Sequence, residues 1–226
     1  MTDRERLVFE HLSQFVSDHK KEVIEKVLSA RTRQVTVVLE DIFQSQNASA
    51  VIRTCECMGI QDIHMVENIT KYSTNPKVLK GSNKWIDIKH HASKTLNNTE
   101  LVLSQLKDQG YKILATDPAE DGISIEKISL ENKIAFVFGN ELRGVSKEAL
   151  ALCDQKVRIP MYGFTESYNL SVSVAICLSM TIPKMHAEGR FIGLTDHEKD
   201  FLKLKWYRKI VRKSDLIERE FIRTIE

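Results

Sequence analysis

The sequence predicts an α/β protein with a mainly parallel sheet. Short runs of β-branched or apolar residues alternate along the chain with segments whose apolar residues repeat at helical spacing. Several of these runs are apolar without interruption, which is typical of strands covered on both faces. A helix between two strands is the usual connection in a parallel sheet. The 226 residues, 42% hydrophobic and 28% charged, suit one large domain and not a disordered chain.

The strands are expected where short apolar or alternating runs occur. There are six of these, at 35–40, 62–67, 85–91, 111–117, 134–140 and 156–161. The first, VTVVLE, is rich in β-branched residues and indicates a buried strand. The run at 85–91, WIDIKHH, alternates instead, so we expect a half-buried or edge strand there.

The helices are expected where apolar residues recur every three or four positions. They lie at 3–30, 47–58, 98–107, 146–153, 169–186 and over the last ~30 residues. Gly59 and Gly110 follow two of them and are natural stops. Ser146 can cap the start of the helix at 146–153, and either Asn98 or Thr99 can cap the one before it.

The organisation along the chain indicates one core with helical extensions. No low-complexity linker or long repeat interrupts the sequence. We therefore expect an N-terminal helical extension at 1–30, an α/β core at 31–190 and a C-terminal helix at 191–226. The charged N-terminus lacks an apolar signal core, and no run approaches the ~20 apolar residues of a membrane span. These features favour a cytoplasmic protein without a membrane partner.

The cysteines and histidines do not form a recognisable metal motif. Cys55 and Cys57 are two positions apart, so on a helix their thiols do not share a face. No Cys or His pair has the spacing of a zinc site. We expect no metal, and we interpret all four cysteines, the other two being Cys153 and Cys177, as small buried hydrophobic residues in a reducing compartment.

Polar and glycine-rich segments follow four of the predicted strands. They are 41–47, 116–118, 139–144 and 161–169. Ligands of parallel α/β sheets bind beyond the carboxyl ends of the strands, so these segments should meet at one edge. Glycine also lets backbone groups approach a ligand closely. None of the segments has the glycine pattern of a dinucleotide-binding or phosphate-binding loop.

Three segments together carry a specific signal. They are NASAVIRT at 47–54, FGNELRGVS at 138–146 and IPMYGFTESYNLSVSV at 159–174. Their order and content resemble the three motifs of the SPOUT class of RNA methyltransferases. Within that class the chain is most similar to the TrmH branch, which methylates ribose 2′-hydroxyls with S-adenosylmethionine. The resemblance covers about 33–185, and the flanking helices are similar to those of tRNA guanosine-2′-O-methyltransferases that act on the D-loop.

The resemblance implies a fold and a cofactor that periodicity does not indicate. Proteins of this class thread the C-terminal part of the core through a loop, which makes a deep trefoil knot. The knot loops would hold S-adenosylmethionine in a bent shape. By the family pattern, the pocket would be lined by Thr116, Gly139, Ile159 and Tyr168. The family often has leucine at the position of Tyr168. The class is also characteristically homodimeric, with the site near the dimer interface.

The resemblance also implies which residues carry the chemistry. Arg53 matches the catalytic arginine, and it could reach the cofactor of the partner subunit. A ribose 2′-hydroxyl is poorly acidic, so its proton must be removed, or its O–H bond weakened, during methyl transfer. Either a phosphate-oriented arginine accepts that proton, as proposed for the family, or a cationic arginine stabilises the forming alkoxide, which the chemistry of arginine favours.

Four more residues of the motifs are candidate site residues. Asn47 could face the same pocket as Arg53, or cap its own helix, or do both. Glu141 would orient Arg53 or Asn47 through a charge-assisted hydrogen bond. Ser167 and Asn169 would position groups of the substrate or cofactor, and Asn169 could also cap the helix that follows.

The RNA contact is expected in the C-terminal segment. The whole chain has 33 Lys and Arg against 31 Asp and Glu, a formal net charge of +2, which taken alone argues against a nucleic-acid partner. Residues 199–213, however, have seven basic residues and one acidic residue, a net charge of +6. Trp206 and Tyr207 lie among these charges. The segment could contact RNA, with the cations on phosphates and the aromatic rings stacked on bases, or the rings could pack on the core of the protein. The candidate RNA-binding residues are Lys203, Lys205, Arg208, Lys209 and Arg212.

The function that the sequence favours is therefore methylation of a tRNA ribose 2′-hydroxyl, at guanosine 18 of the D-loop. Ribosomal RNA methylation is the nearest alternative. Many relatives with that activity carry an extra RNA-binding domain of ~80 residues before the knot, whereas about 30 residues precede the first strand here. A non-catalytic RNA-binding protein that keeps the knot is a third possibility, which the intact motif residues disfavour.

Overall fold

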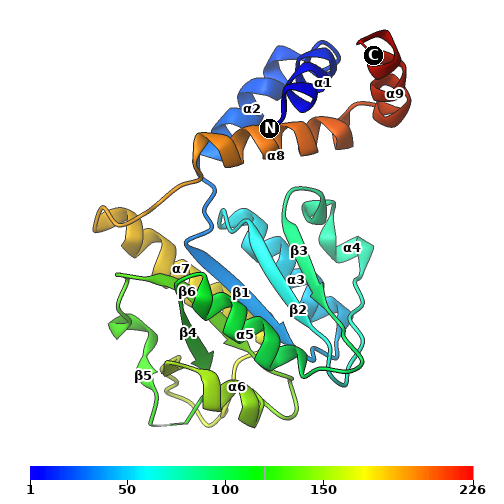
Figure 1. The fold of residues 1–226 in the computed structure, drawn as a ribbon. Coiled ribbons are helices and arrows are strands. Elements are labelled where there is room, and N and C mark those ends of the chain that lie inside the picture. The colour runs from blue at the N-terminus through cyan, green and yellow to red at the C-terminus, as the bar shows by residue number, and fades with distance from the viewer. Residues whose placement is uncertain (120, 226) are drawn as a thin grey trace. The chain divides into compact units, whose positions relative to one another are not determined.

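The computed structural model describes residues 1–119 and 121–225, and these fold into two compact units. One unit is the continuous segment 32–192, close to the expected core at 31–190. The other unit combines both ends of the chain, 1–31 and 193–226. The two extensions that the sequence indicated separately thus belong to one helical unit (Figure 1).

The unit at 32–192 is built on a seven-stranded sheet in which all neighbouring strands are parallel. Its strands are β1 (Val35–Glu40), β2 (Asp62–Val66), β3 (Asp87–His91), β4 (Tyr111–Thr116), β5 (Ile123–Ser124), β6 (Lys133–Phe138) and β7 (Gln155–Arg158). Their spatial order is β3-β2-β1-β6-β4-β7-β5. The predicted α/β class with a parallel sheet is confirmed, and β3 is an edge strand as expected.

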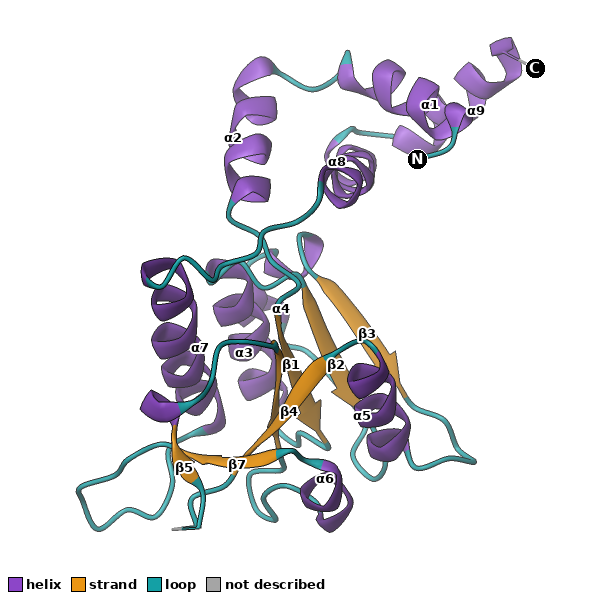
Figure 2. Cartoon of the chain, turned by 60° about the vertical axis from the view of Figure 1, so that its left-hand side comes forward, coloured by secondary structure: helices purple, strands orange, loops and turns teal. Residues whose placement is uncertain are grey.

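Helices cover both faces of this sheet, which explains why its central strands are largely apolar (Figure 2). On one face, α3 (Ser45–Cys57) packs against α7 (Leu170–Ala187), and both cover side chains such as Val37 and Phe136. On the other face, α5 (Asn98–Asp108) and α6 (Lys147–Leu152) cover side chains such as Val38 and Val137.

The structure contains short elements that no sequence pattern indicated. They are α4 (Pro76–Leu79), η1 (Ser82–Lys84), β5 and η2 (Ile125–Lys127). Each has four residues or fewer, so none is long enough to show a period. Two helix starts also differ from the prediction. The cap of α5 is Asn97, and α3 begins at Ser45, so Asn47 lies inside the first turn and is not its cap.

The helical unit corrects the prediction of one continuous helix at each end of the chain. The N-terminal segment forms α1 (Asp3–Ser13) and α2 (Asp18–Ser29), because the chain is extended at Ser17. The C-terminal segment forms α8 (Asp196–Ile210) and α9 (Ser214–Ile225). Here Lys213 adopts a left-handed conformation with φ 58°, and the Ser214 hydroxyl donates to the Arg208 carbonyl, which turns the chain.

Two of the aromatic residues expected at an RNA surface form the core of this unit. Trp206 is 2% exposed, and the guanidinium of Arg31 lies 5.6 Å from the centre of its ring. Tyr207 is 4% exposed and stacks on Phe9. Of the two interpretations left open by the sequence, base stacking or packing, the structure shows packing for both rings, because an α-helix of this small unit needs them to bury its apolar face.

The long apolar helix α7 has the length and composition to cross a membrane. In the structure, it lies against α3 and buries residues that include Val174, Leu178 and Met185. The cysteines are all free thiols. Cys55 and Cys177 are buried as expected, and burial raises the pKa of Cys177 to about 12. Cys57 is exposed on α3, so the interpretation as a buried residue is wrong there.

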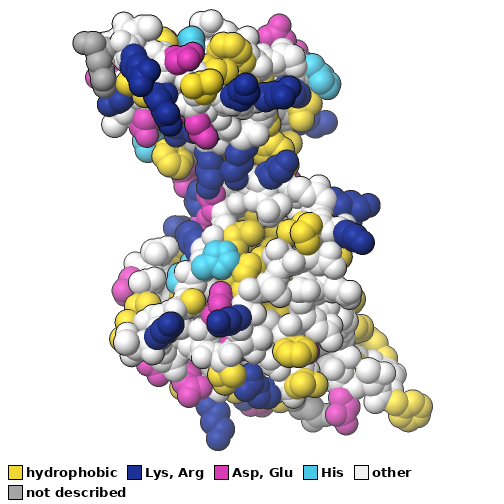
Figure 3. Space-filling model, turned by 90° about the vertical axis from the view of Figure 1, so that its right-hand side faces the viewer, with side chains coloured by type: hydrophobic (Ala, Val, Ile, Leu, Met, Phe, Trp, Pro, Cys, Tyr) yellow, Lys and Arg dark blue, Asp and Glu magenta, His cyan; other side chains and the backbone are white. Residues whose placement is uncertain are grey.

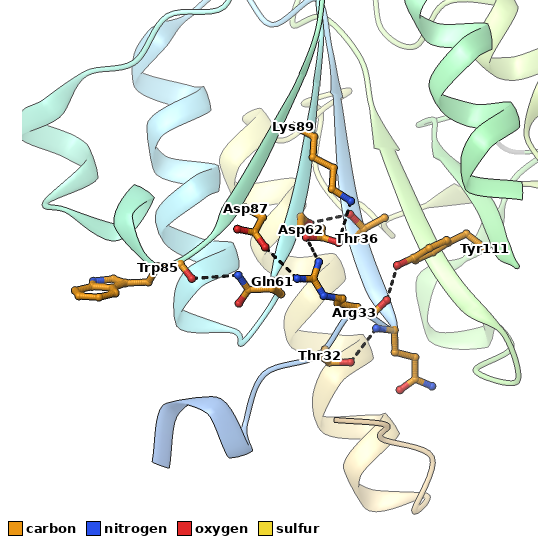
Figure 4. Close-up of polar contacts among 10 residues, drawn as sticks. Thr32, Arg33, Thr36, Gln61, Asp62, Trp85, Asp87, Lys89 and Tyr111 are labelled. Atoms are coloured by element: carbon orange, nitrogen blue, oxygen red, sulfur yellow. Dashed lines mark hydrogen bonds and ion pairs between the residues drawn. The ribbon is translucent and has the colours of Figure 1, made fainter. Parts of the chain in front are cut away.

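A network of charges holds the start of the sheet together (Figure 4). The Arg33 guanidinium forms ion pairs with Asp62 at the start of β2 and with Asp87 at the start of β3. The Lys89 ammonium lies 3.1 Å from the second carboxylate oxygen of Asp62. The buried Asp62 carboxylate is thus neutralised from two sides, as a buried charge requires.

A pair of histidines on β2 and β3 makes the stability of the unit sensitive to acid. His64 Nδ1 lies 3.0 Å from His91 Nε2, and their rings stack. Burial, assisted by Lys89 and His91, lowers the pKa of His64 to about 3. Burial also lowers the pKa of His91.

We expect the free energy of unfolding to fall as the pH drops below 6.5. The unfolded chain takes up a proton on His64 near its ordinary pKa of 6.5, while the folded unit keeps the ring neutral down to about 3. For one such proton the loss by pH 5 is about 2 kcal/mol. Urea unfolding at pH 7 and pH 5 measures it. His64→Gln should lose less stability between the two values, whereas His19→Gln, at an exposed position on α2, should behave as wild type. Equal losses in wild type and His64→Gln would contradict the assignment.

Candidate active site

A cleft lies at the carboxyl ends of three neighbouring strands, β6, β4 and β7. Thr116 ends β4, Gly139 follows β6 and Ile159 comes directly after β7. Two adjoining cavities of about 480 Å³ and 80 Å³ share Thr116, Pro118, Ser167, Tyr168 and Ser173 in their walls. The larger volume is within the range of small-molecule sites, and the position is the usual one in parallel sheets.

The structure places the four predicted cofactor residues in the walls of this cleft. Thr116 and Tyr168 line both cavities, Gly139 lines the larger one and Ile159 lines the smaller one. The Thr116 hydroxyl donates to the Val137 carbonyl at 2.9 Å, so the side chain is turned toward β6 and held there. Tyr168 is 42% exposed, which leaves part of its ring open to a ligand.

A tight turn at 139–144 forms one wall of the cleft. The Gly144 N–H donates to the Asn140 carbonyl at 2.8 Å and closes the turn. A Cβ at Gly139 would lie 2.1 Å from the Gly144 carbonyl oxygen and 2.3 Å from the Val145 nitrogen. These are backbone atoms that cannot rotate away. Only glycine therefore fits at 139 with the turn in this shape.

Glu141 is carried by this turn to the start of α3. Its carboxylate accepts hydrogen bonds from the backbone N–H groups of Phe43 at 3.2 Å and Gln44 at 3.4 Å. It also accepts one from the Asn47 amide at 2.9 Å. The carboxylate thus sits at the positive end of the helix dipole, where a negative charge is stabilising, and it fixes the backbone just before α3, whose N-cap residue Gln44 makes no side-chain capping bond. Of the two expected partners of Glu141, the structure brings Asn47 to it.

Asn169 joins the third motif to the other two. Its amide donates to the Asn47 side-chain oxygen at 3.1 Å, and its own oxygen accepts from the Ser171 N–H as the cap of α7. Asn47, Glu141 and Asn169 therefore form one chain of hydrogen bonds along the cleft wall. Ser167 lines the same cleft with an exposed side chain. Its hydroxyl has no hydrogen-bond partner within 1–119 and 121–225.

Arg53 is the predicted site residue that the structure does not bring to the cleft of its own chain. Asn47 is 7% exposed at the inner end of α3, whereas Arg53 lies on the exposed side of the helix. Six residues correspond to about 600° of helical rotation, so the two side chains point about 120° apart. Arg53 forms no ion pair with Glu141 or with any other part of the chain that the structure describes.

Two residues that support the cleft lie in the polar segments 41–47 and 139–144 but were not among the predicted site residues. Asn140 is 8% exposed, and its amide donates to the Asp41 carbonyl at 2.7 Å while its oxygen accepts from the Leu142 and Arg143 N–H groups. Asp41 has a left-handed backbone with φ 51°, and one of its oxygens accepts three consecutive N–H groups at 68–70. A polar residue within two positions of the end of a buried strand is the signal that could have identified both.

The basic residues of α8 differ in how far they are available to RNA. The Lys203 ammonium pairs with Glu25, and its side chain is 17% exposed. The Arg208 guanidinium binds both oxygens of Glu218, at 2.8 and 2.6 Å, and this carboxylate raises the pKa of Arg208. Lys205 is half-buried, while Lys209 and Arg212 are exposed. The formal charge of the segment is thus partly neutralised within the helical unit.

The titratable side chains give no indication of a metal centre. Among the residues that the structure describes, no three His, Cys, Asp or Glu side chains gather in a way that could hold a metal ion. The histidine pair on β2 and β3 has no third ligand of this kind.

Comparisons with known proteins agree with the cleft and its motifs. A model of the SpoU rRNA Methylase family matches residues 34–179. The tRNA (guanosine(18)-2′-O)-methyltransferase of Borreliella burgdorferi is 44% identical over 207 residues, which are 92% of this chain and 93% of that protein. A protein of the same name from Thermus thermophilus is 33% identical over 72% of this chain and 81% of its own length.

A solved structure extends the likeness to the arrangement of the elements. The crystal structure of the A. aeolicus TrmH/SpoU tRNA modifying enzyme matches with a TM-score of 0.77 at 27% identity. The match covers 87% of this chain and 98% of that one. The resemblance to the TrmH branch is thus confirmed. Because the family model spans well over half of the residues and a relative is 44% identical over most of the length, the chain belongs to the SpoU rRNA Methylase family.

Proposed function

We propose that this chain transfers a methyl group from S-adenosylmethionine to the ribose 2′-hydroxyl of guanosine 18 in tRNA. The observation that carries the proposal is the 44% identity, over 92% of the chain, to a tRNA (guanosine(18)-2′-O)-methyltransferase. The cleft at the carboxyl ends of β4, β6 and β7 supports it, because the three motifs meet there. The relative of known fold is also described as a tRNA modifying enzyme.

The cleft has the chemistry to hold S-adenosylmethionine. Ile159, Val157 and Phe138 supply apolar walls for an adenine ring, and the glycine turn supplies backbone polar groups. Thr116, Gly139, Ile159 and Tyr168 would hold the cofactor, which brings a methyl group already activated on a sulfonium. The proposed knot would place the loops at 139–144 and 159–169 side by side, and their residues share the walls of the larger cavity.

The residues of the hydrogen-bonded chain would position the nucleophile. Glu141 is a positioning residue, because its oxygens are already occupied by the N–H groups of Phe43 and Gln44, just before α3, and by the Asn47 amide. That leaves Asn47 and Asn169 in a fixed orientation, which favours precise placement of a bound ribose. The Ser167 hydroxyl is free to contact a hydroxyl or phosphate oxygen of the RNA.

Arg53 would act on the substrate as a cation supplied by a second subunit. We propose a homodimer because Arg53 points away from the cleft of its own chain. Exposed apolar side chains on α7 and the preceding loop support such an interface, since Val172 is 43%, Tyr162 is 96% and Phe164 is 107% exposed. Two subunits related by a twofold axis would each receive the arginine of the other. The four free thiols fit the reducing cytoplasm, which we propose as its location.

The exposed cations at the end of α8 would contact the tRNA backbone. We expect Lys209→Gln with Arg212→Gln to weaken tRNA binding and to lower the slope of log affinity against log salt by about 1.5, since each lost phosphate contact contributes about 0.7 to 0.9. Filter binding between 50 and 200 mM salt would measure it.

The matched control is Lys20→Gln with Lys26→Gln, which removes two exposed cations from α2 of the same unit. Arg208→Gln is a poor probe, because it leaves Glu218 without its partner and should lower stability instead. Equal effects of the two double variants would show that α8 has no special role in binding RNA.

One experiment tests the proposed reaction and its nearest alternative. The protein is incubated with labelled S-adenosylmethionine and with either tRNA or ribosomal RNA, and the methylated riboses are mapped. We expect label at guanosine 18 of tRNA. The family description names ribosomal RNA, so label in that RNA alone would favour the alternative. Label in neither, with measurable RNA binding, would favour a non-catalytic RNA-binding protein.

A further inference from the structure

The connection between β2 and β3 carries a local charge that the count for the whole chain conceals. We refer to residues 68–86 as the crossover. It contains four lysines, Lys71, Lys77, Lys80 and Lys84, and no Asp or Glu. In a chain with nearly equal numbers of basic and acidic residues, this net charge of +4 over nineteen residues is a marked local excess.

The lysines of the crossover are exposed, and three of them have no carboxylate partner. The side chains of Lys71, Lys77 and Lys80 form no ion pair within the described part of the chain. Other lysines of the same unit do form them. Lys89 pairs with Asp62, Lys107 with Asp154 and Lys156 with Asp121. Other cations of the unit, such as Arg53 and Lys112, also form no ion pair within the described residues. What distinguishes the crossover is that three such cations occur within ten residues of a segment that contains no Asp or Glu.

The backbone beneath these lysines is firmly attached to the core. The Asp41 carboxylate accepts the N–H groups of residues 68–70, and the Asn75 N–H donates to the Ser49 hydroxyl of α3 at 2.7 Å. Leu79 and Ser82 are buried. Because the frame is ordered, a ligand that binds the lysines orders only their side chains and not a whole loop.

The crossover runs along the β3 edge of the sheet, where α4 and β3 lie on the right in Figure 1. It starts at the carboxyl end of β2, which is the edge that carries the methyl-transfer cleft, and it ends at the start of β3. Figure 3 faces this side, and basic side chains are distributed along it. The lysines are thus placed along a segment whose course leads from the catalytic edge to the opposite edge of the sheet.

A groove of about 630 Å³ connects the start of the crossover to the catalytic edge. Lys71 and Lys94 line it together with the exposed apolar side chains of Ile69 and Leu96. Ser146 also lines it, whereas Gly144 and Val145 just before it line the cleft. One loop thus separates the two cavities.

Three carboxylates line this groove as well. Asp41 has one oxygen occupied by three N–H groups, Glu67 lies 3.7 Å from a ring nitrogen of His90, and Glu148 is in the first turn of α6. The excess of positive charge is therefore on the crossover itself. The groove between the crossover and the cleft is lined by both basic and acidic side chains.

We propose that the crossover is a second RNA-binding surface, on which Lys71, Lys77 and Lys80 contact consecutive backbone phosphates of the bound tRNA. This inference rests on the proposed function. A polyanion whose reacting ribose lies in the cleft must continue past the rim of the cleft, and the crossover offers it a row of unpaired cations on a rigid frame. Phosphate contacts of this kind position RNA without reading its sequence.

The test compares two triple variants with the same loss of charge. Lys71→Gln, Lys77→Gln and Lys80→Gln are combined in one protein. Lys112→Gln, Lys127→Gln and Lys133→Gln are combined in the control, which removes three cations from the half of the sheet away from β3. Each protein is assayed for S-adenosylmethionine binding, for tRNA affinity between 50 and 200 mM salt, and for methyl transfer at saturating tRNA.

We expect the crossover variant to bind tRNA at least ~10-fold more weakly at low salt. The slope of log affinity against log salt concentration should be smaller in magnitude by about 2 to 3. Its cofactor affinity and its rate at saturating tRNA should match wild type, because none of the three lysines lines the cleft. The control should retain most of its affinity for tRNA.

Two outcomes would overturn the inference. Equal weakening by both triple variants would mean that only the total charge matters. Wild-type affinity and salt slope in the crossover variant would mean that the lysines serve another ligand, such as an acidic protein surface. Either result is distinct from failure of the proposed function, in which wild-type protein itself would not methylate tRNA.

Discussion

Replacement of Arg53 by alanine is expected to slow methyl transfer by a factor of about 10² to 10³, which is the usual effect of removing one stabilising charge from an active site. Binding of S-adenosylmethionine should persist, because Arg53 does not line the cleft of its own chain. Single-turnover methylation with saturating tRNA measures the rate, and calorimetry measures cofactor affinity. Arg53→Lys should recover part of the rate, because it keeps the charge but not the planar fork.

The position of Arg53 allows a sharper test through mixed dimers. A subunit with Arg53→Ala keeps an intact cleft, and a subunit with Asn169→Ala keeps an intact arginine. If each arginine serves the partner's cleft, mixing the two inactive proteins creates one complete site in each mixed dimer and restores activity. Mixtures that stay inactive would overturn the proposal that Arg53 acts in the partner, and wild-type turnover by Arg53→Ala would remove it from the chemistry altogether.

Gly139→Ala is expected to abolish measurable cofactor binding. The new methyl group would lie 2.1 Å from a backbone oxygen, so the turn at 139–144 must open. A displacement of about 1 Å at an active site costs about 100-fold or more in rate, and this turn both lines the cleft and carries Glu141. Calorimetric titration with S-adenosylmethionine measures the loss. Circular dichroism of the same sample shows whether the sheet remains folded.

Two other glycines of the same region provide graded controls. Gly163→Ala should be silent, because nothing lies within 4 Å of the added Cβ and the backbone is not left-handed. Gly144→Ala also meets open space, but its φ of +70° makes the substitution strained by about 1 to 2 kcal/mol. We therefore expect a moderate loss of stability there. Cofactor binding by Gly139→Ala that equals that of Gly163→Ala would contradict the steric argument.

The strands of the sheet could be predicted from the sequence because burial on both faces leaves a direct mark on composition. VTVVLE and KIAFVF are largely apolar for this reason. The structure has β1 at the predicted bounds, and β6 begins one residue before and ends two residues before the predicted strand. Their order across the sheet could not be predicted, since period and composition do not indicate which strands are neighbours. The short elements α4 and β5 could not be predicted either, because a few residues are too short to show a helical or strand period.

The site could be predicted as a set of residues but not as a geometry. The motifs indicated Asn47, Glu141 and Asn169, yet hydrogen bonding between them depends on how β1, β6 and α7 pack, which is a property of the fold. Arg53 shows a different limit, because its six-residue spacing from Asn47 already turns its side chain about 120° away, while only the fold shows which of the two faces the cleft. The role of Trp206 stayed open between base stacking and packing, because an aromatic residue among charges has the same local pattern on a surface as in the core of a small helical unit.

The hydrogen bonds that join Asn47 to Glu141 and to Asn169 connect residues that are 94 and 122 positions apart in the chain. Such contacts form slowly, because long loops must close before the contacts can contribute to stability. During synthesis, the cleft wall cannot form until the segment that begins α7 has left the ribosome. A chain that ends at residue 168 contains all the described strands but lacks Asn169 and α7, so the wall of its cleft is incomplete.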